Sequence, residues 1–152
     1  MKTMLKKILL VDDDADDCFF FGEQLKEIEP SLKLVCLNET KHLLLHASEL
    51  NPDLIFLDID MPGMDGFDCL VDLKKHPELK QIPVVMYSSS FLPKDMAKAY
   101  RLGASLYVSK PAGLAPIKAT IKGIIELDWS QPEKITADHF NRDRYTSFRL
   151  PK

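Results

Sequence analysis

The chain has 152 residues, a length that fits one domain and leaves little room for a second. Apolar residues make up 45% of it, enough for one sizeable core, and 20 basic residues against 23 acidic ones leave a net charge of −3. This near-balance argues against a protein that binds nucleic acid or a membrane surface through bulk positive charge. The acids are unevenly spread, because five of them lie within the six residues from Asp12 to Asp17.

The cysteines and the N-terminal apolar run bear on the compartment. Cys18, Cys36 and Cys69 are odd in number, widely spaced and without a CxxC pair, so we expect three buried thiols rather than a disulfide framework or a zinc site. The apolar run over residues 8–11 stops at Asp12 and is too short for a signal peptide or a transmembrane span. We therefore predict a soluble cytoplasmic protein.

Short apolar runs alternate along the chain with longer segments of helical periodicity. In chain order the patterns predict a strand over Lys7–Val11, a helix over Ala15–Ile28, a strand over Leu32–Leu37, a helix over Thr40–Leu50, a strand over Asp53–Leu57, a helix from Phe67 to His76, a strand over Ile82–Tyr87, a helix from Pro93 to Gly103, a strand over Leu106–Val108 and a helix over Leu114–Leu127. Five strands that alternate with five helices indicate βαβ units and a mainly parallel sheet. Right-handed crossovers then give a doubly wound three-layer α/β fold, whose functional groups gather outside the carboxyl ends of the strands.

The last stretch, residues 128–152, differs in character from the rest. Trp129 and further aromatic residues stand there among charged ones, and residues 133–141 are expected to form a short helix. The stretch is too short for a separate output domain. We expect Trp129 and its aromatic neighbours to pack either on the preceding domain or on a second subunit.

The residues that follow the predicted strands are acidic, hydroxylated or basic. Asp12 and Asp13 follow the first strand, Asp58 and Asp60 the third, Ser88 and Ser89 the fourth, and Ser109 and Lys110 the fifth. In the inferred fold these four strands lie side by side, so their end groups converge on one point. Carboxylates held close repel one another, and a divalent cation with oxygen ligands, Mg²⁺ rather than zinc, relieves that repulsion. Lys110 and Ser88 then suit the oxygens of a phosphoryl group, so the pattern favours transfer of a phosphoryl group to a carboxylate.

Three stretches, Ile8–Asp13, Leu57–Gly66 and Gly103–Pro111, resemble in order and spacing the receiver domain of bacterial two-component response regulators. The resemblance covers roughly residues 5 to 127. It implies a receiver domain over 1–127 with a (βα)5 flavodoxin-like fold, in which five parallel strands follow the order 2-1-3-4-5. Residues 128–152 would be a C-terminal extension without an effector domain.

The resemblance also implies a role for each residue at the strand ends. Asp58 would be the phosphoacceptor, which takes its phosphoryl group from a sensor histidine kinase or a histidine phosphotransfer protein. Asp13 would bind Mg²⁺ directly, together with Asp58 and the backbone carbonyl of Asp60, and Asp12 would act on the ion mainly through water.

The remaining implied residues bind the phosphoryl group or shape the site. Lys110, Ser88 and Ser89 would bind the phosphoryl oxygens. Ser88 and Tyr107 would form a switch, in which the hydroxyl moves toward the phosphate and the aromatic ring turns inward. Pro62, Gly66 and Pro111 would have structural roles, with a cis peptide bond between Lys110 and Pro111.

Plainer interpretations stay open for several of these residues. Asp12 and Asp13 can act as a helix N-cap, although Asp14 fits that position better, and Ser88 and Ser89 can be ordinary turn hydroxyls. Tyr107 can be a static half-buried aromatic. The sequence further predicts a solvated helix start at Asp14, Asp16 and Asp17, and a contact surface at one of the adjacent residues Phe20 and Phe21.

The expected function is a phosphorylation-controlled interaction module in a phosphorelay, which is no enzyme beyond assisting its own phosphorylation and dephosphorylation. A homodimer is left open, and neither nucleic acid nor membrane is expected as a partner. One alternative is a degenerate receiver that binds its partner constitutively. Another is a phosphatase of the haloacid dehalogenase type, because the stretch Asp58-Ile59-Asp60 matches its DxD motif, but the order of the acidic motifs argues against it.

Overall fold

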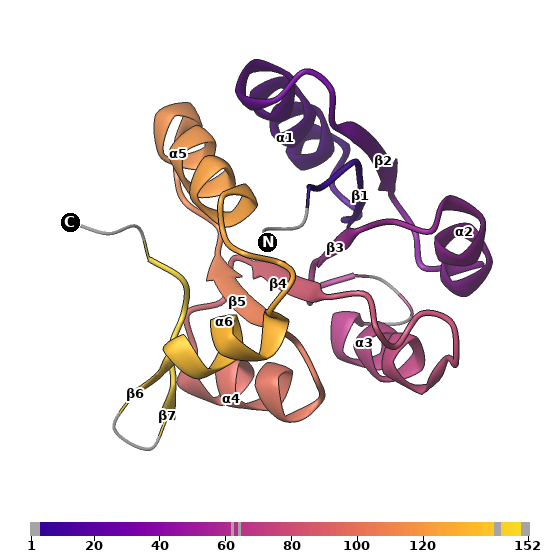
Figure 1. Ribbon diagram of the computed structural model, residues 1–152, viewed down its shortest axis with the longest axis vertical. Helices are drawn as coiled ribbons and strands as arrows, with labels where there is room; N and C mark the ends of the chain where they lie inside the picture. Colours follow the sequence, from indigo (N-terminus) through magenta and orange to yellow (C-terminus); the bar gives the residue numbers. More distant parts are fainter. Residues whose placement is uncertain (1–3, 62, 64, 142–143, 150–152) are drawn as a thin grey trace.

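The computed structural model describes residues 4–61, 63, 65–141 and 144–149. Its elements in chain order are β1 (Lys7–Val11), α1 (Ala15–Ile28), β2 (Lys33–Leu37), α2 (Leu43–Leu50), β3 (Leu54–Leu57), α3 (Gly66–Lys75), β4 (Val84–Ser88), α4 (Pro93–Arg101), β5 (Leu106–Ser109), α5 (Leu114–Ile125), α6 (Pro132–Asp138), β6 (Phe140–Asn141) and β7 (Arg144–Tyr145) (Figure 1). The five strands and five helices predicted up to residue 127 are all confirmed, and their ends shift by only a few residues.

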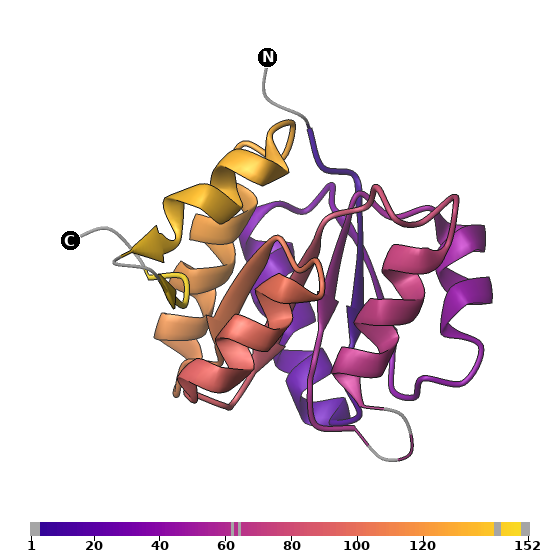
Figure 2. The same cartoon turned by 90° about the horizontal axis from the view of Figure 1, so that it is seen from below.

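The five longer strands form one parallel sheet in the order β2-β1-β3-β4-β5, as predicted. Helices α1 and α5 cover one face of the sheet, and α2, α3 and α4 cover the other, which gives three layers (Figure 2). Successive strand residues point to opposite faces, so Leu9 packs in the cluster under α2, α3 and α4 while Leu10 packs under α1 and α5. Burial on both faces is why the strands read as continuous apolar runs.

Local capping places the helices directly after the strand ends. The Asp14 carboxylate accepts hydrogen bonds from the backbone N–H groups of Asp16, at 2.9 Å, and Asp17, at 3.4 Å, so only three residues separate α1 from β1. Pro93 occupies the first turn of α4, and Gly103 follows that helix with a φ of +106°, a conformation that glycine adopts without strain. These short connections hold the residues after each strand at one edge of the sheet.

The C-terminal segment packs on the domain that precedes it in the same chain (Figures 1 and 2). Trp129 is buried in the core cluster on the face of the sheet that α1 and α5 cover, and its Nε1 donates to the carbonyl of Ile124 at 2.9 Å. Thr136 of α6 donates through Oγ1 to the carbonyl of Ser105 at 2.8 Å, just before β5. Farther along, the backbone N–H of Phe148 donates to the carbonyl of Tyr107 at 2.7 Å.

The expectation of three free thiols is wrong. Cys18 in α1 and Cys36 in β2 form a disulfide, with their Cα atoms 6.2 Å apart, and only Cys69 of the three cysteines is a free, buried thiol. The cause is tertiary: β2 pairs with β1 in parallel, and the first turn of α1 returns past the end of β2. Their 18-residue separation in the sequence conceals this contact.

The adjacent phenylalanines differ in exposure, and of the two expected contact residues only Phe20 is exposed. Phe21 is 1% exposed and packs in the core against Phe56, whereas Phe19 is 61% exposed and Phe20 is also exposed. Three consecutive helical positions point in different directions, so only one of them meets the sheet. Phe20 remains available as a contact residue, and Phe21 does not.

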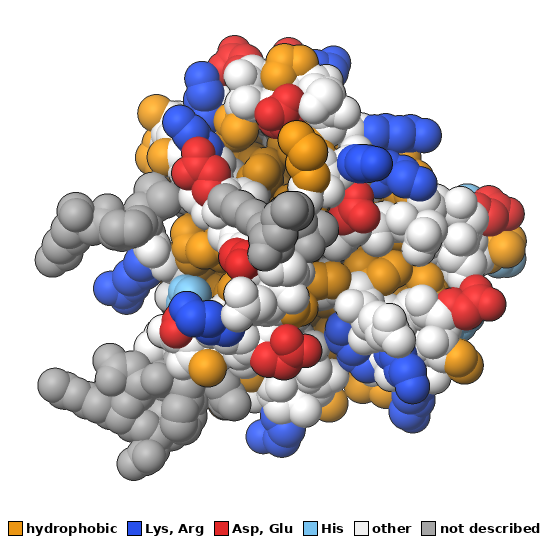
Figure 3. All heavy atoms as spheres, viewed as in Figure 1, with side chains coloured by type: hydrophobic (Ala, Val, Ile, Leu, Met, Phe, Trp, Pro, Cys, Tyr) orange, Lys and Arg blue, Asp and Glu red, His pale blue; other side chains and the backbone are white. Residues whose placement is uncertain are grey.

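One face of the molecule shows how charged side chains are distributed. On the face drawn in Figure 3, acidic and basic side chains are interspersed among apolar patches, in keeping with the small net charge. Within the part of the chain that the structure describes, no helix combines the length and the apolar character that crossing a bilayer requires.

Because Trp129 is buried to the same degree as the core of the sheet, we expect it to contribute to the stability of the whole fold. Trp129→Ala should lower the free energy of unfolding by about 3–5 kcal/mol, through lost burial and the cavity left behind. Phe91→Ala, which truncates an aromatic side chain that is 72% exposed, should change it by less than about 0.5 kcal/mol. Urea unfolding followed by circular dichroism measures both. Equal effects would show that residue 129 is not part of the cooperative unit.

Candidate functional site

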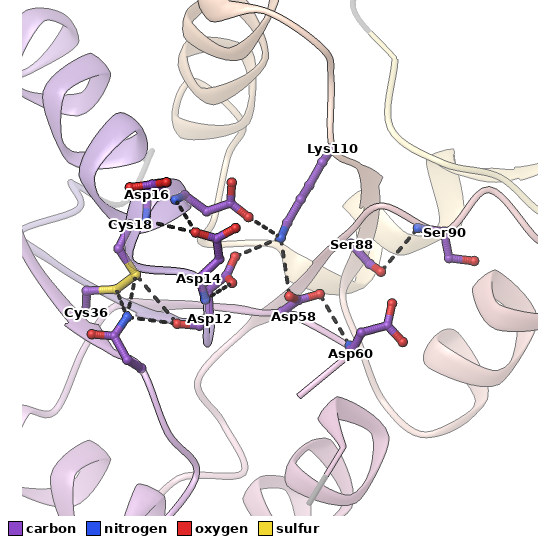
Figure 4. Close-up of polar contacts among 12 residues, drawn as sticks. Asp12, Asp14, Asp16, Cys18, Cys36, Asp58, Asp60, Ser88, Ser90 and Lys110 are labelled. Atoms are coloured by element: carbon purple, nitrogen blue, oxygen red, sulfur yellow. Dashed lines mark hydrogen bonds and ion pairs between the residues drawn. A yellow bond between two sulfur atoms is a disulfide. The ribbon is translucent and has the colours of Figure 1, made fainter. Parts of the chain in front are cut away.

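Strand register brings the end groups of β1 and β3 together. Val11 lies opposite Leu57 in the parallel pairing of these strands, so Asp12 and Asp58 emerge side by side. Ser88, the last residue of β4, lies opposite Ser109 of β5, which places Lys110 one residue beyond the same edge. The predicted convergence of strand ends is what the topology produces (Figure 4).

Three carboxylates form an acidic cluster at this edge. Asp12, Asp13 and Asp58 each offer an oxygen within 4.8 Å of the others. Asp12 is 0% exposed and Asp58 is buried, whereas Asp13 is open to solvent. An oxygen-only donor set with one open side fits a hard divalent cation, which keeps several waters in such a site.

Lys110 neutralises part of this cluster. Its Nζ lies 2.8 Å from Asp12 Oδ2, 2.8 Å from Asp17 Oδ2 and 3.3 Å from Asp58 Oδ2 (Figure 4). The ring of Tyr87 lies 5.6 Å from the same nitrogen and adds a weaker attraction. Burial by itself lowers the pKa of Lys110, but its hydrogen bonds to Asp12 and Asp17 outweigh this and raise that pKa above its usual value.

Asp17 also belongs to the site, through its ion pair with Lys110. The sequence did not predict this role, because Asp17 was expected only to form part of a solvated helix start. The only signal available was its position in the first turn of α1, close to the end of β1. Lys110 stands 93 residues farther along the chain, so the contact appears only once the strands are ordered in space.

The two buried carboxylates bind protons more readily than ordinary ones. Burial raises the pKa of Asp12 to about 6, although the hydrogen bond from Lys110 and the backbone N–H of Asp14 both oppose that rise. Burial likewise raises the pKa of Asp58, against the attraction of Lys110. A nearby positive charge therefore stabilises the charged form of each carboxylate and compensates for its lost hydration.

The hydroxyl groups at the end of β4 and directly after it occupy different environments. Ser88 is buried at the site, and its Oγ accepts a hydrogen bond from the N–H of Ser90 at 3.3 Å (Figure 4). Ser89 is exposed. Asp60 is exposed too, and its N–H donates to Asp58 Oδ1 at 3.4 Å.

Tyr107 is fully buried rather than half-buried, and its ring points into the domain. Its hydroxyl donates to the carbonyl of Ser90 at 3.0 Å, and the hydroxyl of Ser109 donates to the same carbonyl at 3.1 Å. Ser90 in turn donates through Oγ to Asp95 at 2.6 Å. Ser90 is a second residue near the site that the sequence did not single out.

The residues expected to be structural give three different outcomes. A Cβ atom on Gly66 would overlap the backbone carbonyl of Asp58, so only glycine fits there. Pro62 lies outside the described residues. The peptide bond between Lys110 and Pro111 is trans, the lower-energy isomer, which corrects the expected cis bond.

Comparison with known proteins decides the family. Residues 8–122 match the response regulator receiver domain. The chain belongs to the response regulator receiver family. The match spans the sheet and most of α5, and α6 and the hairpin β6–β7 lie beyond it.

The receiver is similar over most of its length to small response regulators. It is 30% identical to response regulator Rcp1 of Synechocystis, over 78% of this chain and 86% of that protein. The crystal structure of the phosphorylated cyanobacterial phytochrome response regulator RcpA superposes with a TM-score of 0.75 at 31% identity, covering 84% of this chain and 96% of that one. The Mn²⁺-bound form of Rcp1 superposes with a TM-score of 0.70 at 31% identity, covering 78% and 91%.

The raised pKa of Asp12 predicts a specific pH dependence for the metal-free receiver. Because the folded pKa, about 6, exceeds the ordinary value of 3.8, the folded state binds more protons than the unfolded state between these values. The contribution of Asp12 to the free energy of unfolding should therefore decrease as pH rises from about 4 to about 6. Urea unfolding in the presence of a chelator should show a shallower decrease in Asp12→Asn than in the wild type. An unchanged profile in the variant would contradict the assignment.

Proposed function

We propose that this receiver accepts a phosphoryl group on Asp58 and thereby switches a protein-interaction surface in a phosphorelay. The observation that carries the proposal is the position of Asp58, a buried carboxylate that belongs to the acidic cluster and also contacts the ammonium of Lys110. The family match and the similarity to Rcp1 and RcpA support the same conclusion. The donor is a sensor histidine kinase or a histidine phosphotransfer protein, and the setting is the bacterial cytoplasm.

In the proposed reaction, a carboxylate oxygen of Asp58 forms a bond to phosphorus while the bond from phosphorus to the donor histidine nitrogen breaks. The electron pair of that broken bond stays on the nitrogen. Asp12, Asp13, Asp58 and the backbone carbonyl of Asp60 are the residues that would hold Mg²⁺, the acidic cluster being the observation that fits it. When bound, Mg²⁺ neutralises charge on the transferring phosphoryl oxygens. Lys110 supplies a second positive charge next to Asp58.

The switch involves the hydroxyl groups after β4 and the aromatic residue in β5. Ser88 is the buried hydroxyl at the site and the proposed partner of a phosphoryl oxygen, with exposed Ser89 providing a further donor. The N–H of Ser90 donates to Ser88 Oγ, and the hydroxyl of Tyr107 donates to the carbonyl of Ser90. Movement of Ser88 therefore shifts the residue to which Tyr107 is hydrogen-bonded. A local change of charge at Asp58 is thereby passed to β5, at the edge of the sheet. We assign residues 1–127 to this receiver and residues 128–152 to a C-terminal extension.

The decisive test is covalent phosphorylation. Incubation with acetyl phosphate and Mg²⁺ should give a phosphorylated adduct of the wild-type chain that intact-mass spectrometry detects, and Asp58→Asn should give none. Asp60→Asn is the matched control, because only the backbone carbonyl of Asp60 is assigned to the site, and it should still form the adduct. Absence of an adduct in the wild type, or its persistence in Asp58→Asn, would overturn the proposal.

A further inference from the structure

The hydrogen bonds of Lys110 raise a problem for phosphoryl binding. An ammonium group has three donors, and those of Lys110 are shared among Asp12, Asp17 and Asp58. A phosphoryl oxygen can therefore gain a hydrogen bond from Lys110 only if one of these carboxylates gives up its own. Which carboxylate does so depends on the free-energy cost of leaving each of them without the ammonium.

Asp17 is the partner that Lys110 leaves most easily. The side chain of Asp12 has no exposed surface, so losing its ammonium partner would leave a buried charge without compensation. The side chain of Asp17 is 37% exposed, and water can replace the ammonium there. Asp58 itself carries the phosphoryl group once it is modified.

The backbone of Asp17 is fixed by the capped start of α1 and not by Lys110. Its backbone N–H donates to Asp14 Oδ1 at 3.4 Å, within the capped first turn of α1. Lys110 therefore contacts a carboxylate from α1, that of Asp17, as well as the Asp58 carboxylate that follows β3.

We propose that Asp17 is a positioning residue: it holds part of the Lys110 ammonium away from Asp12 and Asp58, and releases it when a phosphoryl group arrives. The proposal rests on the function assigned above. Its first consequence concerns the cation, because an ammonium drawn toward Asp17 competes less for the carboxylates of Asp12 and Asp58. Its second consequence concerns the phosphoryl group, which has to compete with Asp17 for Lys110.

These two consequences have opposite signs in one variant. In Asp17→Ala, the affinity for Mg²⁺ alone should fall and the affinity for beryllofluoride, a phosphoryl mimic, should rise at saturating Mg²⁺, each by about fivefold, the size expected for a partly exposed ion pair. Asp16→Ala is the matched control, because it removes the same charge from the same helical turn at an exposed position. Isothermal titration calorimetry measures both affinities in the full chain.

Each outcome of this experiment has a defined meaning. Equal effects of the two variants, or a shift of both affinities in one direction in Asp17→Ala, would overturn the role of Asp17. Failure of the wild-type chain to bind beryllofluoride in a manner that requires Asp58 would instead overturn the proposed function, so the two failures are distinguishable.

A second and independent observation concerns the outer edge of the sheet. β5 is an edge strand, and residues 146–149 of the C-terminal segment lie along it. The N–H of Phe148 donates to the carbonyl of Tyr107 at 2.7 Å, and the N–H of Ser109 donates to Ser147 Oγ at 3.2 Å. Tyr100 of α4 joins the two parts, because its hydroxyl accepts from the N–H of Tyr107 at 2.9 Å and donates to the carbonyl of Thr146 at 3.1 Å.

The same β5 residues face the phosphoacceptor side. The side-chain hydroxyls of Tyr107 and Ser109 both donate to the carbonyl of Ser90, and the N–H of Ser90 donates to Ser88 Oγ. The strand therefore lies between Ser90, in the loop after β4, and the C-terminal segment. One arrangement of β5 satisfies both sets of hydrogen bonds.

We infer that docking of residues 146–149 on β5 and binding of a phosphoryl group at Asp58 stabilise each other through Tyr107 and Ser109. This inference also rests on the proposed function, in which an inward Tyr107 accompanies the engaged Ser88 hydroxyl. Because coupling of this kind is reciprocal, weakening the docked segment has to weaken phosphoryl binding.

Two substitutions at one position isolate the backbone contact. Phe148→Pro and Phe148→Ala both remove the phenyl ring, but only the proline lacks the N–H that donates to Tyr107. We expect Phe148→Pro to bind beryllofluoride about fivefold more weakly than Phe148→Ala, the ratio that corresponds to one ordinary hydrogen bond. In the wild type, beryllofluoride should also slow hydrogen exchange at the amides of Ser109 and Phe148.

Equal affinities of the two variants, or tighter binding by Phe148→Pro, would overturn the coupling. An unchanged exchange rate at both amides on beryllofluoride binding would overturn it as well. Loss of beryllofluoride binding in the wild-type chain would count against the phosphoacceptor function and not against the coupling.

Discussion

The ammonium of Lys110 holds together a group of carboxylates that would otherwise repel one another. Asp12 and Asp58 are buried at the ends of adjacent strands, where loss of water makes their charged forms costly. Lys110 reaches them across β4 from the end of β5, and its contacts with both are possible only in this strand order. The geometry of the acidic cluster thus depends on one cation supplied by a distant part of the chain.

The backbone around this cation is held from two sides. On one side, the N–H of Lys110 donates to the carbonyl of Ser88, so β4 and β5 remain paired up to the site. On the other side, Asn38 after β2 donates through Nδ2 to the carbonyl of Asp12 at 3.0 Å, next to the disulfide between Cys18 and Cys36. The buried carboxylates therefore lie on a backbone braced at both flanks, while Asp13 and Asp17 remain accessible to solvent.

The C-terminal segment holds the backbone at the edge of the sheet through hydrogen bonds to β5. An edge strand presents unpaired backbone groups, and proteins usually cover or blunt such edges. Here Phe148 and Tyr100 satisfy the outward backbone groups of Tyr107, the residue whose hydroxyl reaches toward the site. Tyr107 is therefore the residue of β5 whose backbone is covered by the C-terminal segment and whose side chain contacts the switch region.

Much of this architecture was determined by the sequence alone. The strands and helices follow from apolar periodicity, capping by Asp14 and the breaks at Pro93 and Gly103, all of which act over a few residues. The convergence of Asp12, Asp58, Ser88 and Lys110 follows from a general property of parallel sheets, namely that the ends of neighbouring strands meet.

Only the tertiary structure decided which side chains meet across long stretches of chain. The pairing of Asp17 with Lys110, the disulfide between Cys18 and Cys36, and the docking of Phe148 on β5 each join elements whose separation in space no local pattern encodes. The exposure of Phe19 beside buried Phe21 likewise depends on how α1 is rotated against the sheet. Local propensity determines where helices and strands form, whereas packing determines how each helix is rotated and which elements lie beside it. The long-range contacts named above therefore follow from packing and not from local sequence.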